Sequence, residues 1–574
     1  MSSLTPLFDR LVGLETEYAL RFHPACSFAR VPTRFQLYSG LIQSLRSRLP
    51  VVRAKHFKEG VFTGNGGAVW FETERTAAGG GLIEGATPEC RGPHQVLTYQ
   101  RAQDRLLAES GLQAVPGGRL TLLKNCRDGR DNVYGAQENY EATLASGWRL
   151  AVWRAGLVLL VPLVLLTWLG LLATLVGTVL FLVLAGGLYL LVRWLAGPLP
   201  RVALALFGRD LVERRETGGP LAPWLELLLI WVARVVTAPL AVALILLAHA
   251  TAFRELRRRL IPLLVSRPIL AGSGLLDANG NFQLAQKAPA INTVCGFGGY
   301  LHDRPLFTFG HFLKALSFET LAAPADYLTL FRRRQRLQIN LGDSNMADAA
   351  ELLRVGTTLL VIDAIEAGVI DKVPTVRRPI HALHRICADP SLQAAVRLTD
   401  GRNMTALALQ RFYLQACQRY VAGHPQPSAE AREVLQLWSD TLDILEREPE
   451  ALVGVLDWVT KRRLLAVAQD GTWAERKKID LRYHELADEG YFQLWSRTGK
   501  VLRLLDEEDV ARATRMPPPD SPATLRARYI REFSGGEEPL TVNWRRVEIG
   551  RGRRAKVIRL DRSRRAPDGS ENRS

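Results

Sequence analysis

Two glutamates near the N-terminus, Glu15 and Glu17, are spaced so that they could bind one metal ion together. They lie in Gly13–Tyr18, inside the segment Val12–Phe22, whose polar and apolar residues alternate as in a half-buried strand. Side chains two residues apart on a strand face the same way. Magnesium prefers oxygen ligands and keeps waters and phosphates in its other positions. Two carboxylates on one strand face, joined by acidic residues of neighbouring strands, would suit such an ion.

Four later glutamates could join this pair if the sheet brings their strands together. The first of them ends a short apolar strand expected at Ala68–Glu72, after the Asn65-Gly66-Gly67 turn. Each glutamate alone is weak evidence, because acidic side chains are mostly exposed to water. The predicted site therefore depends on their convergence. The four candidates are Glu72, Glu84, Glu89 and Glu138.

A long apolar run follows these motifs. No charged residue occurs between Ala155 and Val192, and Arg154 and Arg193 bound the run. A helix that crosses ~30 Å of hydrocarbon needs about 20 residues, so the run is too long for a single crossing. Its glycines, which include Gly186-Gly187, favour a tight helical hairpin inside the run. We therefore expect the chain to enter a membrane here and to return.

A second apolar run, Leu221–Phe253, contains only two charged residues, Glu226 and Arg234, whose spacing fits interfacial positions. Arginines flank the two runs, which places both flanks in the cytosol by the positive-inside rule. The connecting stretch is also basic, which favours a hairpin in the first run and a second hairpin or an interfacial segment in the second. The alternatives are two crossings in all, or buried core helices of a soluble protein. The connecting arginines are Arg193, Arg201, Arg209, Arg214 and Arg215.

Composition restricts the class of protein. The chain has 574 residues, enough for two or three domains, and a net charge of +17. Beside a membrane segment, this charge favours contact with anionic lipid over nucleic acid, for which no binding motif is evident. The six cysteines are scattered without a CxxC pair, as expected in a reducing cytosol. The first residues lack a basic start followed by an apolar core, so we predict no signal peptide.

The remaining segments predict an α+β protein. We expect a catalytic domain in two parts, residues 8–146 and 259–515, interrupted by a transmembrane insertion at 147–258. A small C-terminal domain is expected at 520–560 and a disordered tail at 561–574. The further predicted elements are the strands Leu120–Lys124 and Leu337–Leu341 and the helices Val96–Ser110, Met346–Ala367, Ala406–Ala422, Ala429–Glu446 and Ala451–Ala468.

Read in order, the motifs resemble one family, the ligase that attaches Pup, the prokaryotic ubiquitin-like protein, and the related Pup deamidase/depupylase. The resemblance covers roughly residues 10–146 and 259–548. It implies a glutamine-synthetase-like catalytic domain, an antiparallel sheet with helices. The matching motifs include Gly13–Tyr18, Asn65-Gly66, Thr87–Cys90, Lys124-Asn125, Tyr134–Tyr140, Gly342–Met346, Asp457-Trp458, Asp480–His484 and Thr541–Trp544. The segments closer to the deamidase/depupylase are Leu264–Arg267, Gly272–Gly274, Phe282–Gln286 and Leu407–Arg411.

The resemblance implies roles for particular residues. It implies that Glu15 and Glu84 hold Mg²⁺. It also implies that Thr87 and Trp544 contact ATP. The aspartate that acts as catalytic base in the family corresponds to Glu72, which keeps the carboxylate but moves it by one methylene. A misplacement of ~1 Å can reduce the rate about 100-fold.

Several positions depart from the family pattern. Trp70 replaces a metal-linked tyrosine, and Ala68 replaces a nucleotide-contacting arginine. Gln137 replaces a histidine, and Thr308–His311 replaces a Thr-Arg-Asp-Glu-Pro-His segment without its arginine. A glycine-rich expansion at Gly79–Gly81 lengthens the loop between the predicted base and metal ligand. The lost cations matter because phosphoryl transfer depends on positioning and electrostatics.

The resemblance implies an ATP-dependent enzyme that acts on a carboxylate or an isopeptide of a small ubiquitin-like modifier or of modified substrate proteins, and the apolar runs imply that this enzyme is anchored in a membrane. A lysine amine would attack the phosphorylated carboxylate, or an activated water would cleave the amide. The departures leave a nucleotide-binding pseudoenzyme or sensor as the alternative. A transporter with a regulatory soluble domain is a second alternative, although the apolar runs contain almost no polar residues of a substrate path. We expect a multi-pass protein of the cell membrane with a cytosolic catalytic domain.

Overall fold

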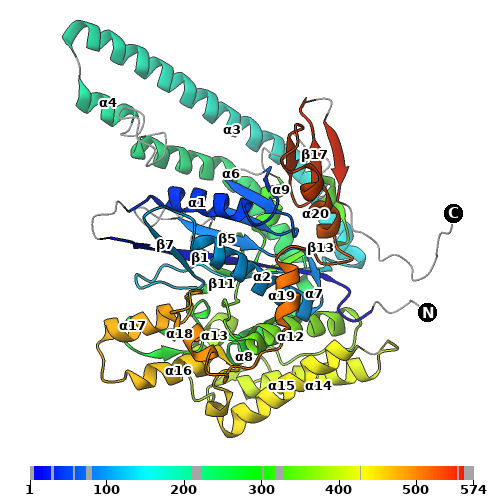
Figure 1. Ribbon diagram of the computed structural model, residues 1–574. Coiled ribbons are helices and arrows are strands. Elements are labelled where there is room, and N and C mark those ends of the chain that lie inside the picture. The colour runs from blue at the N-terminus through cyan, green and yellow to red at the C-terminus, as the bar shows by residue number, and fades with distance from the viewer. Residues whose placement is uncertain are drawn as a thin grey trace, which may run out of the picture.

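An eleven-stranded sheet forms the centre of the molecule, with helices packed against it and a long helical hairpin projecting from one end (Figure 1). This mixture of a largely antiparallel sheet and helices confirms the predicted α+β class. The computed structural model describes residues 6–26, 31–55, 58–72, 81–197, 199–207, 222–299, 303–316, 327–426, 428–552 and 555–560.

Strand β1 (Leu11–Pro24) lies in the middle of the sheet, as its alternating sequence predicts. Its residues alternate between buried and half-buried, so one face of the strand is covered and the other is partly open. The strand order is β11-β12-β13-β8-β1-β5-β4-β3-β2, and β6 and β7 also pair with β1. Among the described strands of this sheet, β11 and β12 form the one parallel pair. The other strands are β2 (Val51–Arg53), β3 (Gly60–Thr63), β4 (Ala68–Glu72), β5 (Leu82–Ala86), β6 (Cys90–Arg91), β7 (Gly118–Leu123), β8 (Gln137–Thr143), β11 (Thr293–Gly296), β12 (Pro305–Thr308) and β13 (Arg334–Ile339).

Helices cover the buried face of the sheet. Helix α12 (Asp348–Glu366) is buried on nearly all sides because it packs between the sheet and helices α7, α14 and α15. Figure 1 shows α14 and α15 at the opposite end of the molecule from the hairpin. The further helices of this body are α1 (Arg34–Arg46), α2 (Pro93–Gly111), α7 (Arg254–Ser266), α8 (Pro268–Ala271), α9 (Gly310–Ala315), α13 (Pro379–Cys387), α14 (Ala406–Ala422), α15 (Ala429–Arg447), α16 (Asp457–Val467), α17 (Trp473–Arg482), α18 (Tyr491–Ser496) and α19 (Glu507–Ala513). Two short hairpins complete it, formed by β9 (Leu275–Leu276) with β10 (Phe282–Gln283) and by β14 (Ala395–Arg397) with β15 (Asn403–Thr405).

The predicted helix Ala451–Ala468 is wrong in its first part. A 3₁₀ turn covers Pro449–Leu452, and α16 begins only at Asp457. Between them, Gly454 adopts φ +86°, and a Cβ there would come within 2.1 Å of the carbonyl oxygen of Lys500. Only glycine tolerates this position, so the chain turns where the apolar pattern continues.

A small C-terminal unit packs on the half-buried face of the sheet. It consists of α20 (Pro522–Phe533) and the strands β16 (Leu540–Val542), β17 (Arg546–Ile549) and β18 (Lys556–Arg559). Its buried side chains, such as Ile530 and Val542, form one apolar cluster with Phe62, Ala68 and Trp70 of β3 and β4. The unit therefore covers the end of this face beside β2–β4. The tail predicted at 561–574 lies outside the described residues.

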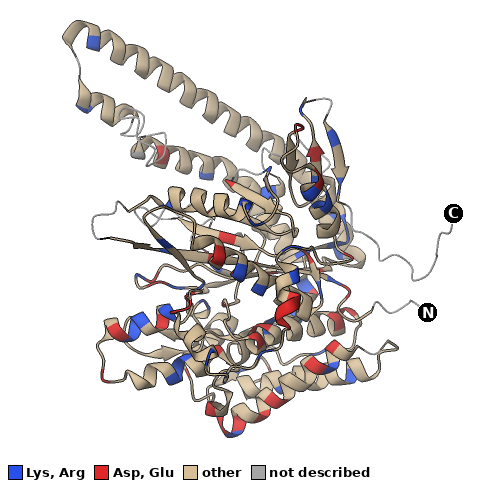
Figure 2. Cartoon of the chain, viewed as in Figure 1, with Lys and Arg blue, Asp and Glu red and all other residues tan. Residues whose placement is uncertain are grey.

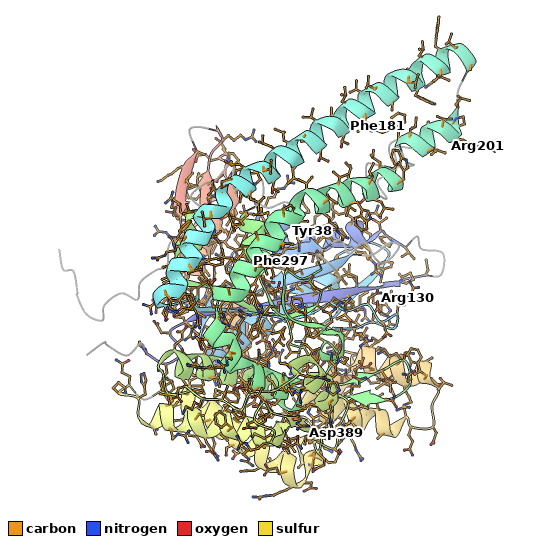
Figure 3. The ribbon with its side chains drawn as sticks, turned by 180° about the vertical axis from the view of Figure 1, so that it is seen from behind. Tyr38, Arg130, Phe181, Arg201, Phe297 and Asp389 are labelled. Atoms are coloured by element: carbon orange, nitrogen blue, oxygen red, sulfur yellow. The ribbon has the colours of Figure 1, made fainter. Side chains whose placement is uncertain are left out.

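The insertion forms one hairpin from two long helices, so the predicted hairpin inside the first run is wrong. The first run belongs to α3 (Gly147–Ala196), a single uninterrupted helix, and the second to α6 (Pro223–Thr251). Both Gly156 and Gly170 face side chains of α6 across the helix pair, so these glycines allow close packing instead of a turn. Figures 1 and 3 show the two helices side by side, with α4 (Pro200–Phe207) near the far end.

The turn between the two runs therefore lies at the far end of the hairpin, as in the two-crossing alternative. Of the connecting arginines, Arg193 and Arg201 belong to this end. Arg209, Arg214 and Arg215 lie outside the described residues. At the near end, the amide of Phe253 donates to the carbonyl oxygen of Leu144 at 2.6 Å, which brings the two flanks of the insertion together.

Two helices in the described part of the chain are long and apolar enough to cross a membrane, Gly147–Ala196 and Trp224–Thr251. Their most apolar windows have mean hydropathies of 2.5 and 2.2, and only 0% and 17% of these windows are buried. Large apolar side chains stand free on α3, among them Leu159, 78% exposed, and Trp194, 80% exposed. Figure 2 shows few charged residues along the hairpin, and most of the length of α3 carries none. The hairpin therefore differs from the buried core helices of a soluble protein, which were the other alternative.

Candidate functional site

The half-buried face of the sheet gathers the glutamates that the sequence singled out. In β1, Glu17 lies opposite Glu84 of β5, and Glu84 lies opposite Trp70 of β4. Residues directly opposite one another in neighbouring strands share a face, as do residues two apart in one strand. The register therefore places Glu15, Glu17, Glu72 and Glu84 on the same face of three adjacent strands.

Lys58 lies between two of these carboxylates. Its ammonium group forms ion pairs with Glu72 and, at 3.1 Å, with Glu84. Burial raises the pKa of the Glu72 carboxyl, and the nearby Glu84 raises it further, whereas Lys58 opposes this shift. The same two carboxylates outweigh burial and raise the pKa of Lys58. The face thus already accommodates a cation between the predicted base and a predicted metal ligand.

Glu15 faces a second group of polar side chains, from β8 and β13. The Asn139 amide donates to Glu15 Oε1 at 3.1 Å, and the Gln338 amide donates to Oε2 at 3.5 Å. The guanidinium of Arg336 lies 3.6 Å from Oε1. Burial raises the pKa of Glu15 although Arg336 opposes the shift. Each carboxylate oxygen of Glu15 therefore accepts from one amide, and Arg336 partly neutralises its charge.

The donor set fits a magnesium ion. The oxygens of Glu15 and Glu84 belong to adjacent strands on one face, and the position of Lys58 shows that a positive charge is stable beside them. Within the described residues, no group of three or more His, Cys, Asp or Glu side chains is placed to hold an ion alone. Waters and phosphates would therefore supply the remaining ligands, as they usually do for Mg²⁺.

Two of the four candidate glutamates do not join the site. Glu138 lies on the opposite, buried face of the sheet, where Arg267 donates to it at 2.6 and 2.8 Å and Tyr140 at 2.7 Å. Burial alone would raise its pKa, but Arg267 and Arg354 outweigh burial and lower it. Glu89 accepts from Arg526 of α20 at 3.1 Å and so fastens the C-terminal unit. Both are structural ion pairs.

The two predicted nucleotide contacts differ in their exposure: Thr87 is buried, and Trp544 is partly exposed. Thr87 is buried, and its Oγ1 accepts from the amide of Leu14 at 3.0 Å, so this hydroxyl locks the strand beside Glu15. Trp544 lies in the turn between β16 and β17, with its ring 4.9 Å from that of Phe62 and the Arg526 guanidinium 4.7 Å from its centroid. Its partly exposed indole offers a flat surface at the rim of the face. Both ATP contacts stay predictions.

The two departures on β4 are accommodated by their neighbours. Trp70 packs against Gly60 of β3, where a Cβ would come within 2.0 Å of the indole, so the glycine makes room for the larger ring. Ala68 is only 2% exposed and lies in the apolar cluster beneath the C-terminal unit. An arginine at position 68 would therefore enter a packed core.

Cations that the sequence analysis missed surround the carboxylates. They come from different elements: Arg336 from β13, Lys314 from α9, and Arg545 from the C-terminal unit, together with Lys58. Electrostatic attraction joins Arg336, Lys314 and Lys58 to Glu15, and Arg545 repels Arg336. The predicted strand Leu337–Leu341 begins one residue after Arg336, whereas the observed strand β13 includes it. The other three depend on tertiary packing.

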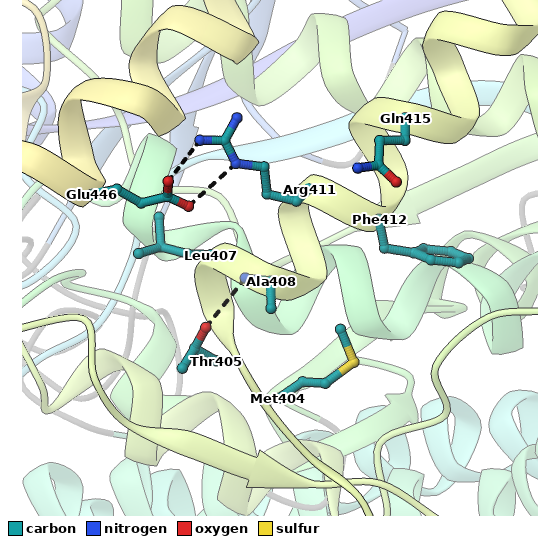
Figure 4. A pocket seen from close by; sticks show the side chains of 8 residues that line it. All are labelled: Met404, Thr405, Leu407, Ala408, Arg411, Phe412, Gln415 and Glu446. Carbon is teal, nitrogen blue, oxygen red and sulfur yellow. Dashed lines mark hydrogen bonds and ion pairs between the residues drawn. The ribbon is translucent and has the colours of Figure 1, made fainter.

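A separate pocket of about 550 Å³ lies at the N-terminal end of α14, far from the carboxylate face (Figure 4). In it, Arg411 forms ion pairs with Asp443 at 2.5 Å and with Glu446 at 2.9 Å, and Thr405 caps α14 by accepting from the amide of Ala408. The pocket includes Leu407 and Arg411 of a segment whose sequence is closer to the deamidase/depupylase. Its charged side chains already pair with each other, so we place the chemistry at the carboxylate face.

Comparisons with known proteins find related sequences over most of the chain. The family described as Pup-ligase protein matches residues 10–548. The Pup deamidase/depupylase of Mycolicibacterium smegmatis is 34% identical over 310 residues, which are 52% of this chain and 59% of the relative. The Pup–protein ligase of Acidimicrobium ferrooxidans is 32% identical over 300 residues, 50% of this chain and 62% of that ligase. These matches thus span less than two thirds of the length of either curated relative.

Solved structures show the same fold. The chain is similar to the crystal structure of the complex between the prokaryotic ubiquitin-like protein Pup and its ligase PafA, with a TM-score of 0.64 and 20% identity, over 96% of this chain and 89% of that one. The Pup ligase PafA in complex with ADP gives a TM-score of 0.59 and 18% identity, over 95% and 94%. At these identities the likeness concerns the fold alone.

Proposed function

The chain belongs to the Pup-ligase protein family, and on that premise we propose that it is an ATP-dependent enzyme acting on a carboxylate or an isopeptide of a small ubiquitin-like modifier. The observation that carries this proposal is the convergence of Glu15, Glu72 and Glu84 on one open sheet face. Cations from other elements surround them, as the phosphates of a nucleotide require.

In this proposal some residues of the carboxylate face bind the metal ion, and another transfers a proton. Glu15 and Glu84 would hold Mg²⁺, which neutralises phosphate charge when bound. Glu72 would accept a proton, from a lysine amine in ligation or from water in amide cleavage. Lys58 must move from Glu72 for this step, and a bound magnesium ion would repel its ammonium group. Relatives of both kinds match the chain, and four sequence segments favour the deamidase/depupylase direction.

Glu15→Ala is expected to weaken the binding of Mg-ATP at least several-fold, because a hard cation loses a carboxylate ligand. Isothermal titration calorimetry of the full chain in detergent, with and without magnesium, measures this change. Glu109→Ala is the matched control, since Glu109 pairs with Arg48 and Arg105 on the outer side of α2. Unchanged Mg-ATP affinity in Glu15→Ala would remove Glu15 from the site.

We further propose that the hairpin anchors the enzyme in a bilayer, with both flanks in the cytosol. Beyond Trp168, the segment Leu169–Ala196 rises about 40 Å, which exceeds the ~30 Å of hydrocarbon to be crossed. The free apolar side chains of this segment and the near absence of charge support the proposal. Because Leu144 and Phe253 are hydrogen bonded to each other, the two flanks would share one side of the membrane. The catalytic face would then act on substrates at the cell membrane.

Membrane attachment is expected to depend on the hairpin. The full chain should float with liposomes and resist extraction by alkaline carbonate. A variant in which a short Gly/Ser linker replaces Leu169–Thr237, and which keeps the buried first part of α3, should do neither, whereas removal of residues 561–574 should change nothing. Reporter fusions at Gly147 and Arg259 should report the cytosolic side. Extraction of the full chain by carbonate, or reporters on opposite sides, would contradict the proposal.

A further inference from the structure

Helix α9 joins the hairpin to the carboxylate face. It follows β12, whose last residue Thr308 pairs with Gln338 of β13, and the Gln338 amide donates to Glu15. The side chain of Lys314, on the last turn of α9, is exposed and lies within electrostatic reach of both Glu15 and Glu84. Within the described part of the chain, Lys314 forms no ion pair of its own. Its ammonium group is thus available to a ligand at the face.

The first half of α3 contacts α9 at its C-terminal end and in its middle. The indole of Trp168 donates to the carbonyl oxygen of Leu316, the residue that ends α9, at 2.9 Å. The indole of Trp153 is fully buried, packs 5.1 Å from the ring of Phe312 in the middle of α9, and donates to the carbonyl oxygen of Leu330 at 2.8 Å. These are directional contacts with the soluble body, unlike the contacts of a lipid-facing indole.

A second contact comes from the other side of the hairpin. The guanidinium of Arg257, which follows α6, lies 5.3 Å from the ring centroid of Phe309 at the start of α9. The same guanidinium donates to the carbonyl oxygen of Ala252 at 3.0 Å, at the end of α6. Because Arg257 belongs to α7, α3 contacts the short helix that carries Lys314 directly, and α6 is linked to it through the start of α7.

The charges at the face show why an added cation is useful. A nucleotide triphosphate would bring several negative charges next to Glu15, Glu72 and Glu84. Lys58 and Arg336 already pair with these carboxylates. The ammonium group of Lys314 is repelled by Lys58 and Arg336 and attracted by Glu15 and Glu84. An anion between these cations would relieve their mutual repulsion.

We propose that the hairpin is a positioning element of the site: α3 fixes α9, and α9 presents Lys314 as a contact for the phosphates of the nucleotide. This inference rests on the proposed function, since it needs a nucleotide at the face. Lys314 is then the phosphate-binding residue, and Trp168 and Trp153 act through it. In this proposal the helix α3 of the anchor contributes directly to the position of a nucleotide-binding residue.

The test measures nucleotide affinity by calorimetry on the full chain in detergent. Lys314→Met keeps the stem of the side chain and removes its charge, and it should weaken Mg-ATP binding about 10-fold or more, as loss of a charged hydrogen bond does. Binding of AMP, which lacks the distal phosphates, should change less than 2-fold. Equal losses for ATP and AMP would overturn the assignment of Lys314 to the phosphates.

Trp168→Phe keeps an aromatic ring and removes the donor to Leu316, and it should weaken Mg-ATP binding several-fold. The same substitution in the Lys314→Met background should have little further effect, because residues that act through one contact are not additive. Trp194→Phe, on the exposed far part of α3, is the matched control and should leave affinity unchanged. Trp153→Phe serves as a second variant if Trp168→Phe does not fold.

The outcomes separate this inference from the proposed function. Wild-type protein that binds Mg-ATP, with unchanged affinity in Lys314→Met, overturns the inference alone. If Trp168→Phe weakens Mg-ATP binding equally in the wild type and in Lys314→Met, the positioning role of α3 is overturned. The assignment of Lys314 to the phosphates is then unaffected. Wild-type protein that binds no nucleotide at all overturns the proposed function and this inference with it.

Discussion

Replacement of Glu72 by glutamine is expected to abolish turnover while Mg-ATP still binds. Glutamine keeps the shape of the side chain but cannot accept a proton, and general-base catalysis typically contributes about 10²–10⁴-fold to a rate. Lys58 keeps its ion pair with Glu84 in this variant, so the geometry around the metal ligand should survive. Release of ADP and processing of a Pup-type modifier ending in glutamine or of its isopeptide conjugate measure the first effect, and calorimetry measures the second.

The matched control for this variant is Glu59→Gln. Glu59 is the neighbour of Lys58 in the sequence, but it pairs with Arg53 at the surface, so its loss should leave turnover within 2-fold of the wild type. Undiminished turnover in Glu72→Gln would show that another group accepts the proton. Wild-type protein that binds Mg-ATP yet turns over neither ATP nor modifier would instead favour the pseudoenzyme.

The site could be predicted in part because its strands follow a local pattern. The alternation in Val12–Phe22 correctly predicts that Glu15 and Glu17 share a face. Whether a glutamate of another strand joins them depends on register, and a shift by one residue moves a side chain to the opposite face. Gln137 lies opposite Glu15, so the next residue, Glu138, points into the core. The residues near Glu138 in the sequence do not determine how its strand pairs with β1, so this register could not be predicted.

The hairpin shows the same limit for the membrane segment. Hydropathy correctly locates both apolar runs, because the position of an apolar run depends only on which residues the sequence contains there. The position of the turn depends instead on which faces of α3 and α6 pack together, at Gly156 and Gly170. The glycines that suggested a turn inside the first run, Gly177 and Gly186-Gly187, lie within the uninterrupted helix with open space beside them.

Arg267→Met is expected to lower the free energy of unfolding by about 3–5 kcal/mol, the usual cost of removing one partner from a buried ion pair. Arg267 and Glu138 are both almost fully buried, so the substitution leaves a carboxylate in the core. Only Tyr140, at 2.7 Å, and the more distant Arg354, at 3.9 Å, would remain beside it. Urea unfolding of the full chain in detergent measures the loss. Asp400→Asn, which removes an exposed ion pair with Arg402, should change stability by less than about 0.5 kcal/mol.

The pH dependence distinguishes a lost charge pair from lost packing. In the wild type the pKa of Glu138 is lowered, so the pair stabilises the fold above the pKa of an unfolded glutamate, about 4.3, and this stabilisation is lost as pH falls through the lower folded value. Without Arg267, burial raises the pKa of Glu138, and protonation removes the uncompensated charge. The stability deficit of Arg267→Met should therefore shrink as pH falls from 7 towards 5, and Arg267→Met/Glu138→Gln should recover part of it at pH 7. A deficit that is constant with pH and unchanged in the double variant would mean that Arg267 stabilises the core through packing and its bond to Thr358, and not through Glu138.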